Sequence, residues 1–546
     1  MEVLRRIDNF LKVDQKGGWK GEGQERWSNH DLDPVPPEKR TWGPWAIMSY
    51  WTSDQFAPSM WSLGSSMIAM GLTCREAIPI TFFAFFLCGI IVCLNGVIGV
   101  RTHCSFPVLI RASLGMWGAA PAIIIRCILS LLWLAIQTYL AGNLTAQMIG
   151  AIWPSYLNIK NTLPEGLGIT TQTLVGFILY WLVQTPVSCI KVEKMRYLFL
   201  VKSAICPIGY CAIAVWALAV TGAKGPMLSG SFNAELAPNN SKAIAVISGL
   251  NAVGGLFSTL QVNVPDILRF GKSGKSNWMQ IIAIPITGTI PVACGIISTA
   301  AAQQLYNVEA WDAATLVSLW GGSSGARAAK FFASFMFLLS TLGVNISANS
   351  ISFATDITGL FPRYLTILRS TIAAGILTLG INPWQIVNGS SSFYNFINAY
   401  PCFLAPIACI MFTDFFIVRR GKLHVEDLYD PNGPFWYTWG FNWRAYVAWI
   451  CALAPNLPGL AHAVNPSNPN VQPYTYYFSW GFAVVASIVM YWGICLVFPP
   501  TASFVAEARY EIDEIEKPAV VKYEGGGSSE GDLEKKEGSS ADVIAV

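Results

Sequence analysis

The chain of 546 residues is 53% hydrophobic and only 12% charged, against roughly 25% charged in an ordinary soluble domain. Its charges gather at the two ends: residues 1–45 and 500–546 hold 16 each, which leaves 35 for the 454 residues between them. A secreted enzyme, a nucleic-acid binder and a disordered regulator are excluded by so low a central charge. The composition predicts a polytopic membrane protein between two soluble tails, with the lipid bilayer as a partner and no nucleic acid.

The central region divides into about twelve apolar runs, each near the ~20 residues that a helix needs to cross a bilayer. Alternating strands of about ten residues, which a barrel would need, are absent from the sequence. We therefore expect an all-α polytopic membrane protein with twelve transmembrane helices, near residues 44–72, 77–99, 117–149, 169–190, 197–222, 243–267, 277–304, 328–360, 366–382, 386–418, 445–464 and 475–498.

The first and sixth of these spans contain residues that interrupt helices. Asp54, Gln55 and Pro58 lie in the middle of span 1, and Gly249, Gly254, Gly255 and Pro265 lie in span 6. Proline removes a backbone donor and glycine weakens a helix, so both spans can break where a cavity supplies partners. Two broken spans five apart are typical of transporters built from five-helix inverted repeats, with the substrate at the midplane. The alternative is a pair of kinked packing helices.

The loops predict how the chain is oriented. Loops after even-numbered spans hold fourteen lysines and arginines, and those after odd-numbered spans hold six, so both termini are expected in the cytoplasm. The expected division is an N-tail at 1–43, a first repeat at 44–222, a second repeat at 243–418, a cytoplasmic loop at 419–444, two extra C-terminal helices at 445–498 and an acidic, disordered C-tail at 499–546.

Spans 3 and 8 each carry a polar stripe on one helix face. The stripes comprise Arg126, Trp133 and Gln137 on span 3, and Asn345, Asn349 and Asp356 on span 8. An indole and a carboxamide one turn apart form a stacking surface beside a hydrogen-bonding group. This combination suits a planar, amide-rich ring, to which Asn349 on the partner repeat can make a second contact.

Four acidic residues lie inside predicted spans, and three of them lie near cytoplasmic ends: Asp266, Asp356 and Asp414. Asp54 is nearest to mid-membrane, where an ionisable group is by default a functional candidate. We expect Asp54 to bind a coupling proton or to contact substrate; the alternative is that it caps the broken helix, with Pro58 starting the next turn. Arg126 and Asp356, each about 10 Å cytoplasmic of its polar pair, are expected to contribute to an inner gate or its ion-pair network, and Asp266 is a further coupling or gating candidate. The alternative is that Arg126 and Asp356 are separate interfacial residues paired with loops.

Seven stretches between Asp31 and Pro499 carry a family resemblance: DLDPVPPEKRTWGPW, SFPVLIRASLG, LLWLAIQ, NVPDILRF, NISANSIS, SSSFYNFINAYPCFLAP and NWRAYVAWICALAPNLPG. With these motifs in order, the chain resembles the nucleobase:cation symporter-1 family, in its fungal uracil/allantoin permease branch. The resemblance implies a twelve-helix, five-plus-five inverted-repeat (LeuT-like) fold with two extra C-terminal helices. The substrates that it implies are uracil, allantoin, uridine, uric acid or related rings, taken up across the plasma membrane.

The resemblance also implies binding roles for particular residues. Trp133, Gln137 and Asn349 match the family's aromatic stack and two amides, and Asn345 and Gln55 are further substrate-binding candidates. Phe257 matches the second aromatic position of the bacterial hydantoin transporter, where many fungal uracil and allantoin permeases resemble one another in having lysine. A Trp133/Phe257 sandwich would favour a flat, uncharged or aromatic ligand rather than uracil or allantoin specifically.

The chain also differs from the family pattern at the positions that bind the coupling ion in the bacterial relative. In the bacterial relative, hydroxyl side chains of span 8 help coordinate sodium. The residues that resemble those positions in this chain are Gly343 and Val344, which have no side-chain oxygen, whereas sodium requires several oxygen ligands. Proton symport is therefore expected, with no metal and no cofactor.

Other functions remain open at this point. Thiamine and nicotinamide-riboside transporters share the outer motifs, and their cationic rings would suit Trp133 and Phe257, with Asp54 as counter-charge. A membrane-embedded enzyme is disfavoured because the sequence has four histidines and no HExxH or GxSxG motif. A channel is disfavoured because the polar residues form a compact cluster rather than a stripe along a pore.

The C-tail offers one regulatory hypothesis. Its accessible lysines make ubiquitin-ligase machinery a candidate partner for triggering endocytosis, at Lys517, Lys522, Lys535 and Lys536. The alternative is a solvated tail without a specific reader.

Overall fold

The computed structural model describes residues 8, 12–13, 26–190, 192–223, 241–464 and 475–510. Within these ranges the regular elements are all helical, as the composition predicts. The C-tail lysines proposed for ubiquitin lie outside the described residues.

Eight helical segments in this part of the chain are long and apolar enough to cross a membrane. They are α4 (Cys74–Thr102), α6 (Ala119–Ile152), Tyr197–Thr221 of α8 (Val192–Thr221), α10 (Lys242–Leu268), α12 (Gln280–Tyr306), Ser324–Leu360, Ser390–Val418 and Tyr476–Val497. Ser324–Leu360 combines α14 (Ser324–Val344), a π-helical segment η4 (Asn345–Ser350) and α15 (Ile351–Leu360). Ser390–Val418 combines α18 (Ser390–Ala399), α19 (Pro401–Phe412) and the π-helical η5 (Thr413–Val418), and the last segment contains α22 (Ser479–Val497).

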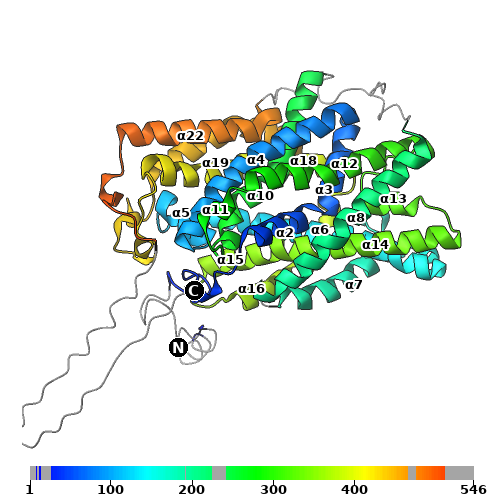
Figure 1. Ribbon diagram of the computed structural model, residues 1–546, viewed down its shortest axis with the longest axis horizontal. Helices are drawn as coiled ribbons and strands as arrows, with labels where there is room; N and C mark the ends of the chain where they lie inside the picture. Colours follow the sequence, from blue (N-terminus) through cyan, green and yellow to red (C-terminus); the bar gives the residue numbers. More distant parts are fainter. Residues whose placement is uncertain are drawn as a thin grey trace, which may run out of the picture. The chain divides into compact units, whose positions relative to one another are not determined.

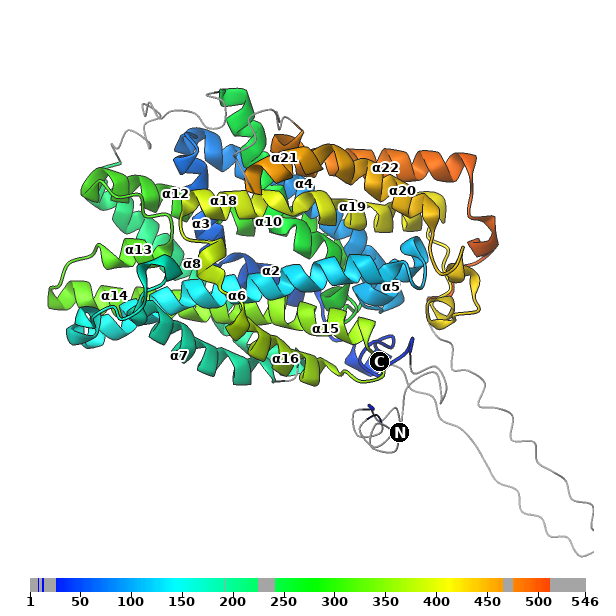
Figure 2. The same cartoon turned by 180° about the vertical axis from the view of Figure 1, so that it is seen from behind.

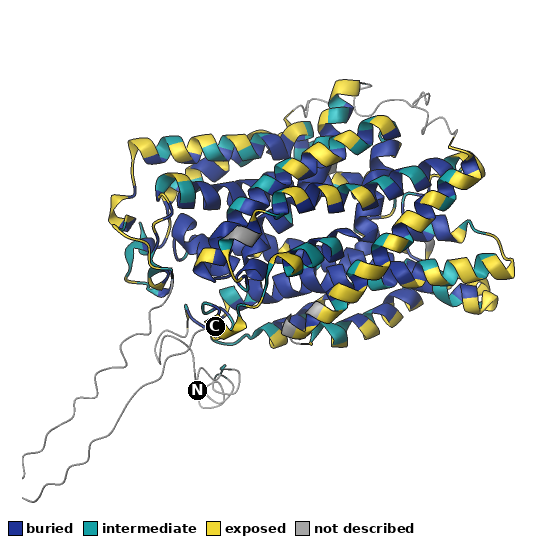
Figure 3. Ribbon diagram, in the orientation of Figure 1, coloured by how far each residue is buried: buried dark blue, intermediate teal, exposed yellow. Residues whose placement is uncertain are grey.

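The other predicted spans coincide with shorter or interrupted helices, so the number twelve stays a prediction. These helices are α2 (Pro44–Gln55) and α3 (Pro58–Ala69), α7 (Thr171–Ser188), α16 (Ile367–Gly380), and α20 (Trp443–Leu453) followed by η8 (Ala454–Asn456) and α21 (Leu457–Val464). Figures 1 and 2 show α2, α7 and α16 running in nearly the same direction as the longer segments, whereas α3 runs across it. Buried residues lie between the helices and exposed ones on their outward faces (Figure 3).

Span 1 breaks where the sequence predicts. Pro58 is the first residue of α3, and Ala57 before it is extended, at φ −136° and ψ 148°. A residue that precedes proline is driven out of the α region, which ends α2 at Gln55. Asp54 and Gln55 consequently lie in the last turn of α2, beside the break.

Span 6 does not break, and this prediction was wrong. α10 continues through Gly249, Gly254 and Gly255 as one helix of 27 residues. Glycine keeps its backbone donor, so it weakens a helix without ending it. Two of these glycines serve packing instead: a Cβ at Gly254 would overlap the Trp480 ring, and one at Gly255 would overlap the carbonyl oxygen of Ile397.

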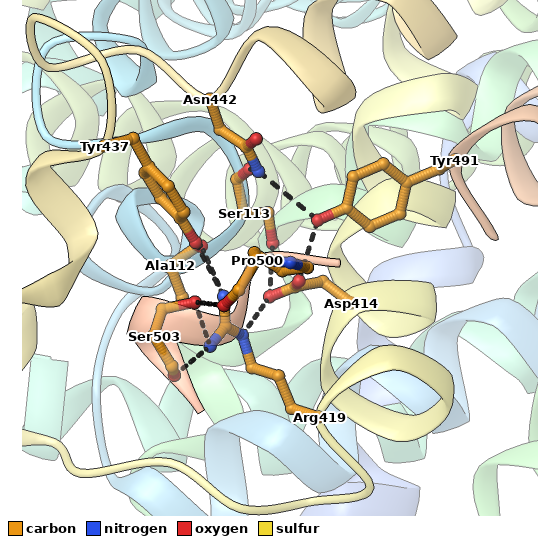
Figure 4. Close-up of polar contacts among 9 residues, drawn as sticks. All are labelled: Ala112, Ser113, Asp414, Arg419, Tyr437, Asn442, Tyr491, Pro500 and Ser503. Atoms are coloured by element: carbon orange, nitrogen blue, oxygen red, sulfur yellow. Dashed lines mark hydrogen bonds and ion pairs between the residues drawn. The ribbon is translucent and has the colours of Figure 1, made fainter. Parts of the chain in front are cut away.

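Residues 499–510 are also ordered, although the predicted disordered tail begins at 499. The backbone amide of Arg509 donates to the carbonyl of Leu423 at 2.9 Å, and that of Val425 donates to the carbonyl of Arg509 at 3.0 Å. Arg419 explains the attachment, since its Nη1 donates to the carbonyl oxygen of Ser503 at 2.7 Å (Figure 4). The segment therefore packs against the 419–444 loop because it supplies acceptors for a buried guanidinium.

The same guanidinium has two further partners. Its Nε donates to Asp414 Oδ2 at 2.7 Å, and its Nη2 donates to the Tyr437 hydroxyl at 2.6 Å (Figure 4). Burial raises the pKa of Tyr437 to about 12, so its neutral hydroxyl also donates to the carbonyl of Ala112 in α5 (Phe106–Leu114) at 2.6 Å. We call Asp414, Arg419, Tyr437 and Ser503 the anchor cluster.

Candidate functional site

A small cavity lies where the break in span 1 meets α6, α10 and the α14–η4 junction. Its volume is about 30 Å³, which leaves room for only a few water molecules. The lining residues are Asp54, Ser59, Met60, Trp133, Gln137, Leu256, Thr259, Leu260, Val344, Ala348 and Asn349. Four residues singled out from the sequence, on three separate helical elements, therefore share one wall: Asp54 of α2, Trp133 and Gln137 of α6, and Asn349 of η4.

Trp133 is held rigidly on the α6 side. Its indole Nε1 donates to the Tyr400 hydroxyl at 3.1 Å, and its ring makes edge contacts with Phe396 at 5.4 Å and Phe393 at 6.2 Å between centroids. The indole is 5% exposed, so nearly all its surface is already packed. Such an aromatic wall can stack on a planar ligand without ordering a mobile side chain.

The two amides differ in how completely they are bonded. Gln137 Nε2 donates to Ser59 Oγ at 2.8 Å, and within the described structure its Oε1 has no partner. Asn349 Nδ2 donates to Asn345 Oδ1 at 2.7 Å. Gln137 therefore brings a free acceptor to the cavity wall, which a ring N–H can satisfy.

Asn345 supports Asn349 and does not line the cavity itself. Its Nδ2 donates to Gln184 Oε1 at 2.7 Å and its Oδ1 accepts from Asn349. Both asparagines lie in the π-helical η4, a wider turn that is frequent at functional sites. Asn345 is thus a positioning residue in this geometry.

Asp54 faces the cavity from the end of α2. Its Oδ1 accepts from Ser347 Oγ of η4 at 3.0 Å, and the residue is 3% exposed. The N-cap residue of α3 is Ala57 rather than Asp54, and the Asp54 carboxylate accepts from the Ser347 hydroxyl rather than from a backbone amide of α3. The capping alternative for Asp54 is therefore not what the structure shows, although Pro58 does start the next helix.

Phe257 and Gln55 lie outside the cavity wall, which corrects the expected Trp133/Phe257 sandwich. The Phe257 ring packs against Trp51 and Phe85, at 5.6 and 5.4 Å between centroids. Leu256, Thr259 and Leu260 present the cavity face of α10 instead. Gln55 points toward α12, where a Cβ at Gly288 would overlap its Oε1.

An ion-pair network lies beyond the cavity, on the side nearer the anchor cluster. Arg126 Nη2 is 2.7 Å from Asp356 Oδ2 and 3.4 Å from Asp266 Oδ2, and all three side chains are buried. Asp266 Oδ1 also accepts from the backbone amide of Phe106, the first residue of α5, at 2.8 Å. One guanidinium thus joins α6, α10 and α15, the arrangement that the gating hypothesis requires.

Sequence reasoning missed several residues of this site. Tyr400, Ser59 and Ser347 orient Trp133, Gln137 and Asp54, respectively. Tyr400 lies in the SSSFYNFINAYPCFLAP stretch and Ser347 lies in NISANSIS, so both motifs carried a signal. Hydroxyl side chains inside apolar runs usually bond to their own helix, and so spacing alone did not single them out.

Comparison with known proteins places this geometry in a family. Residues 34–482 match the family model described as permease for cytosine/purines, uracil, thiamine and allantoin. The chain belongs to this permease family. The resemblance predicted from the seven motifs is thereby confirmed.

Two curated relatives and one solved structure illustrate the match. The permease is 33% identical to the allantoin permease of Saccharomyces cerevisiae over 88% of its own length and 78% of the relative's. It is 30% identical to the uracil permease of the same yeast, over 86% of its own length and 76% of the length of the uracil permease. Mhp1, a nucleobase-cation-symport-1 family transporter solved in a closed conformation with bromovinylhydantoin bound, superposes with a TM-score of 0.65 at 20% identity, over 86% of this chain and 97% of Mhp1. The permease is accordingly a multi-pass membrane transporter of this family rather than an enzyme.

Proposed function

We propose that the permease takes up a planar, nucleobase-like ring across the plasma membrane by proton-coupled alternating access. The observation that carries the proposal is the cavity in which Trp133, Gln137 and Asn349 meet beside Asp54. It combines an aromatic wall, a free carbonyl acceptor and a carboxylate at a helix break. Uracil, allantoin, uridine and uric acid are rings of the class that these groups recognise.

Alternating access requires the cavity to open, because a volume of about 30 Å³ is too small for a ring. The two repeats at 44–222 and 243–418, with spans 11–12 appended, form the moving parts in this proposal. Arg126, Asp266 and Asp356 form the inner gate: their contacts close the cavity toward the cytoplasm, where both termini are proposed to lie. Opening would separate Arg126 from at least one of its two carboxylates.

Proton coupling is assigned to Asp54 in this scheme. Its carboxylate accepts from Ser347 and lines the cavity, so protonation changes a hydrogen bond between α2 and η4 where substrate would bind. Gly343 and Val344 supply no side-chain oxygen for sodium. One proton would thus change a contact between α2 and the η4 segment that carries Asn349.

The ring is tested by competition in cells that lack their own permeases. Unlabelled uracil, allantoin, uridine, uric acid, cytosine, thiamine and nicotinamide riboside compete in turn with the best-transported labelled ring, at two pH values. We expect one neutral ring to compete at the lowest concentration. Displacement by none of the neutral rings would refute the proposed substrate class.

A vitamin cation is the second candidate, and Asp54 is the observation that favours it. A carboxylate on the cavity wall would pair with a thiazolium or pyridinium ring stacked on Trp133. The family description also includes thiamine. Competition by thiamine or nicotinamide riboside alone would select this alternative.

The role of Asp54 has its own test. Asp54→Asn keeps the side-chain shape but cannot ionise, so we expect at least tenfold slower uptake, with the remaining rate independent of external pH. The matched control is Asp430→Asn, a half-buried aspartate of the 419–444 loop. Unchanged uptake with its pH dependence intact in Asp54→Asn would remove Asp54 from the coupling mechanism.

A further inference from the structure

A second pocket lies away from the cavity, between α10, α18, α21 and the 3-10 helix η9 (Tyr476–Phe478). Its volume is about 210 Å³, against about 30 Å³ for the cavity at the break in span 1. We call it the outer pocket, because it adjoins the start of the Ser390–Val418 segment, whose other end carries Asp414 of the anchor cluster. Asn395 in its wall is exposed, so the outer pocket opens at the surface of the molecule.

The lining of the outer pocket is polar but carries no permanent charge. None of the described residues that line it is Asp, Glu, Lys or Arg. Hydroxyl and amide groups, which donate as well as accept, lie beside tyrosine rings with apolar faces. The polar lining residues are Ser248 of α10, Tyr394, Asn395 and Asn398 of α18, His462 of α21, and Tyr476 and Tyr477 of η9. Such a wall suits a small uncharged ring with N–H and C=O groups, because an ion would be left without a counter-charge.

Two hydroxyls of this wall lack partners within the described structure. Tyr476 is 6% exposed and Ser248 is 3% exposed, yet neither Tyr476 Oη nor Ser248 Oγ has a hydrogen-bond partner. A buried polar atom without a partner costs free energy, and buried tyrosines usually find one. Both residues line the outer pocket, so a ligand bound there can supply the missing hydrogen bonds.

Asn251 of α10 holds one side of the outer pocket rigid. Its Nδ2 donates to Asn398 Oδ1 at 2.5 Å, and its Oδ1 accepts from the backbone amide of Trp480 in α22 at 2.6 Å. Asn398 Nδ2 in turn donates to the carbonyl oxygen of Tyr394 at 2.9 Å. These bonds fix α10, α18 and α22 to one another, so a ligand meets a wall that is already ordered.

Helix α18 separates the outer pocket from Trp133 in the wall of the cavity. Phe396 packs against the Trp133 ring, and the hydroxyl of Tyr400, just after the helix, accepts from the indole. Tyr394 and Asn398 line the outer pocket instead. At about 100° per residue the two pairs are centred about 160° apart, so one short helix presents opposite faces to the two sites. In Figure 2, α18 lies between α6 and α21.

We propose that the outer pocket is a second binding site for a small uncharged ring with amide-like N–H and C=O groups. The choice of ring rests on the function proposed above. The ring stacks on a tyrosine of the wall and forms hydrogen bonds with Tyr476 and Ser248. It thereby joins α18 to α10 and η9, which restrains the movement of α18 away from Trp133. A ring in the outer pocket therefore slows the release of a ring held in the cavity.

The first test counts bound rings. Purified full-length permease in nanodiscs is equilibrated with saturating labelled uracil, allantoin, uridine or uric acid in turn, and the ring retained per chain is measured. We expect two rings per chain in the wild type and one in Ala463→Phe, which fills the outer pocket. The matched control is Ala461→Phe, at an exposed residue of the same helix, which should keep two.

The outcomes separate this inference from the proposed function. One ring in the wild type that Ala463→Phe also binds would overturn the outer site and leave the cavity as the binding site. One ring that Ala463→Phe loses would support the outer site and contradict binding in the cavity. Two rings in Ala463→Phe would overturn the outer site, and no bound ring in the wild type would overturn both proposals.

The second test measures release. Labelled ring is allowed to dissociate on dilution with or without excess unlabelled ring, which we expect to slow release at least threefold in the wild type. Tyr476→Phe removes one hydrogen bond, so about 2- to 10-fold more unlabelled ring should be needed for half of this effect. This variant decides the matter if Ala463→Phe does not fold. Equal release with and without unlabelled ring in the wild type, or an unchanged half-effect concentration in Tyr476→Phe, would overturn the inference.

Discussion

Gln137 is the cavity residue whose hydrogen bonding is left incomplete. Ser59 fixes its Nε2, which directs an unpartnered Oε1 to the wall shared with Trp133. A buried carbonyl without a donor costs free energy that a bound ring can recover. Its binding role was predicted from the one-turn spacing to Trp133, but Ser59 as its support was not.

We expect Gln137→Ala to weaken binding of the transported ring. A neutral hydrogen bond contributes about 0.5–1.5 kcal/mol, so the apparent KM should rise about 2- to 10-fold at equal surface expression. Concentration-dependent uptake measures the change, with Gln304→Ala, an exposed amide of α12, as control. An unchanged KM for every ring in the competition panel would place the ligand elsewhere.

The residue-scale predictions succeeded where helical spacing decides which side chains share a face. Arg126, Trp133 and Gln137 lie on one face of α6, and Arg126 does contact Asp356. The prediction that Phe257 lines the cavity was wrong. Its neighbour Leu256 lines the cavity instead, because a one-residue shift along α10 rotates the side chain by about 100°. The packing of Trp51 and Phe85 decides that rotation, and no local pattern encodes it.

At the scale of elements, proline and glycine behave differently in the two spans where breaks were expected. Pro58 ends one helix and starts the next, whereas three glycines remain inside a continuous α10. Local sequence encodes the first result, because proline restricts its predecessor wherever it occurs. The second depends on what packs against the glycines, which only the fold reveals. The π-helical η4 likewise has no sequence signature of its own.

Close packing at Gly255 predicts a stability effect. A methyl group would overlap the Ile397 carbonyl oxygen, and overpacking of this kind costs about 1–3 kcal/mol, so Gly255→Ala should lower the melting temperature of the purified permease. Gly493→Ala is the matched control, since a Cβ at this α22 glycine meets nothing within 4 Å. Equal melting temperatures for the two variants would contradict the packing role.

At the scale of the whole molecule, the anchor cluster joins elements distant in the sequence. Arg419 connects Asp414 at the end of Ser390–Val418 with Tyr437 in the loop and Ser503 after α22 (Figure 4). The all-helical class and the permease family followed from composition and motifs. The ordered 499–510 segment did not, because its acceptors matter only once the fold has buried Arg419.

Removing the guanidinium should destabilise this end of the permease. Arg419→Met leaves Asp414 buried without its cation, and breaking a buried pair costs about 3–5 kcal/mol. We expect less folded protein at the cell surface and a lower melting temperature in detergent. The control is Lys422→Met, at an exposed residue of the same loop, which should resemble the wild type in both measurements. If Arg419→Met also resembles the wild type, the anchor cluster does not stabilise the fold.

The energy source of uptake is the central claim. Accumulation of the best-transported labelled ring is followed to steady state in permease-null cells, with external sodium replaced by choline or the proton gradient collapsed by a protonophore. Proton-coupled transport predicts accumulation above the external concentration that choline leaves unchanged and the protonophore abolishes. Accumulation that requires sodium, or that survives collapse of the proton gradient, would contradict the mechanism.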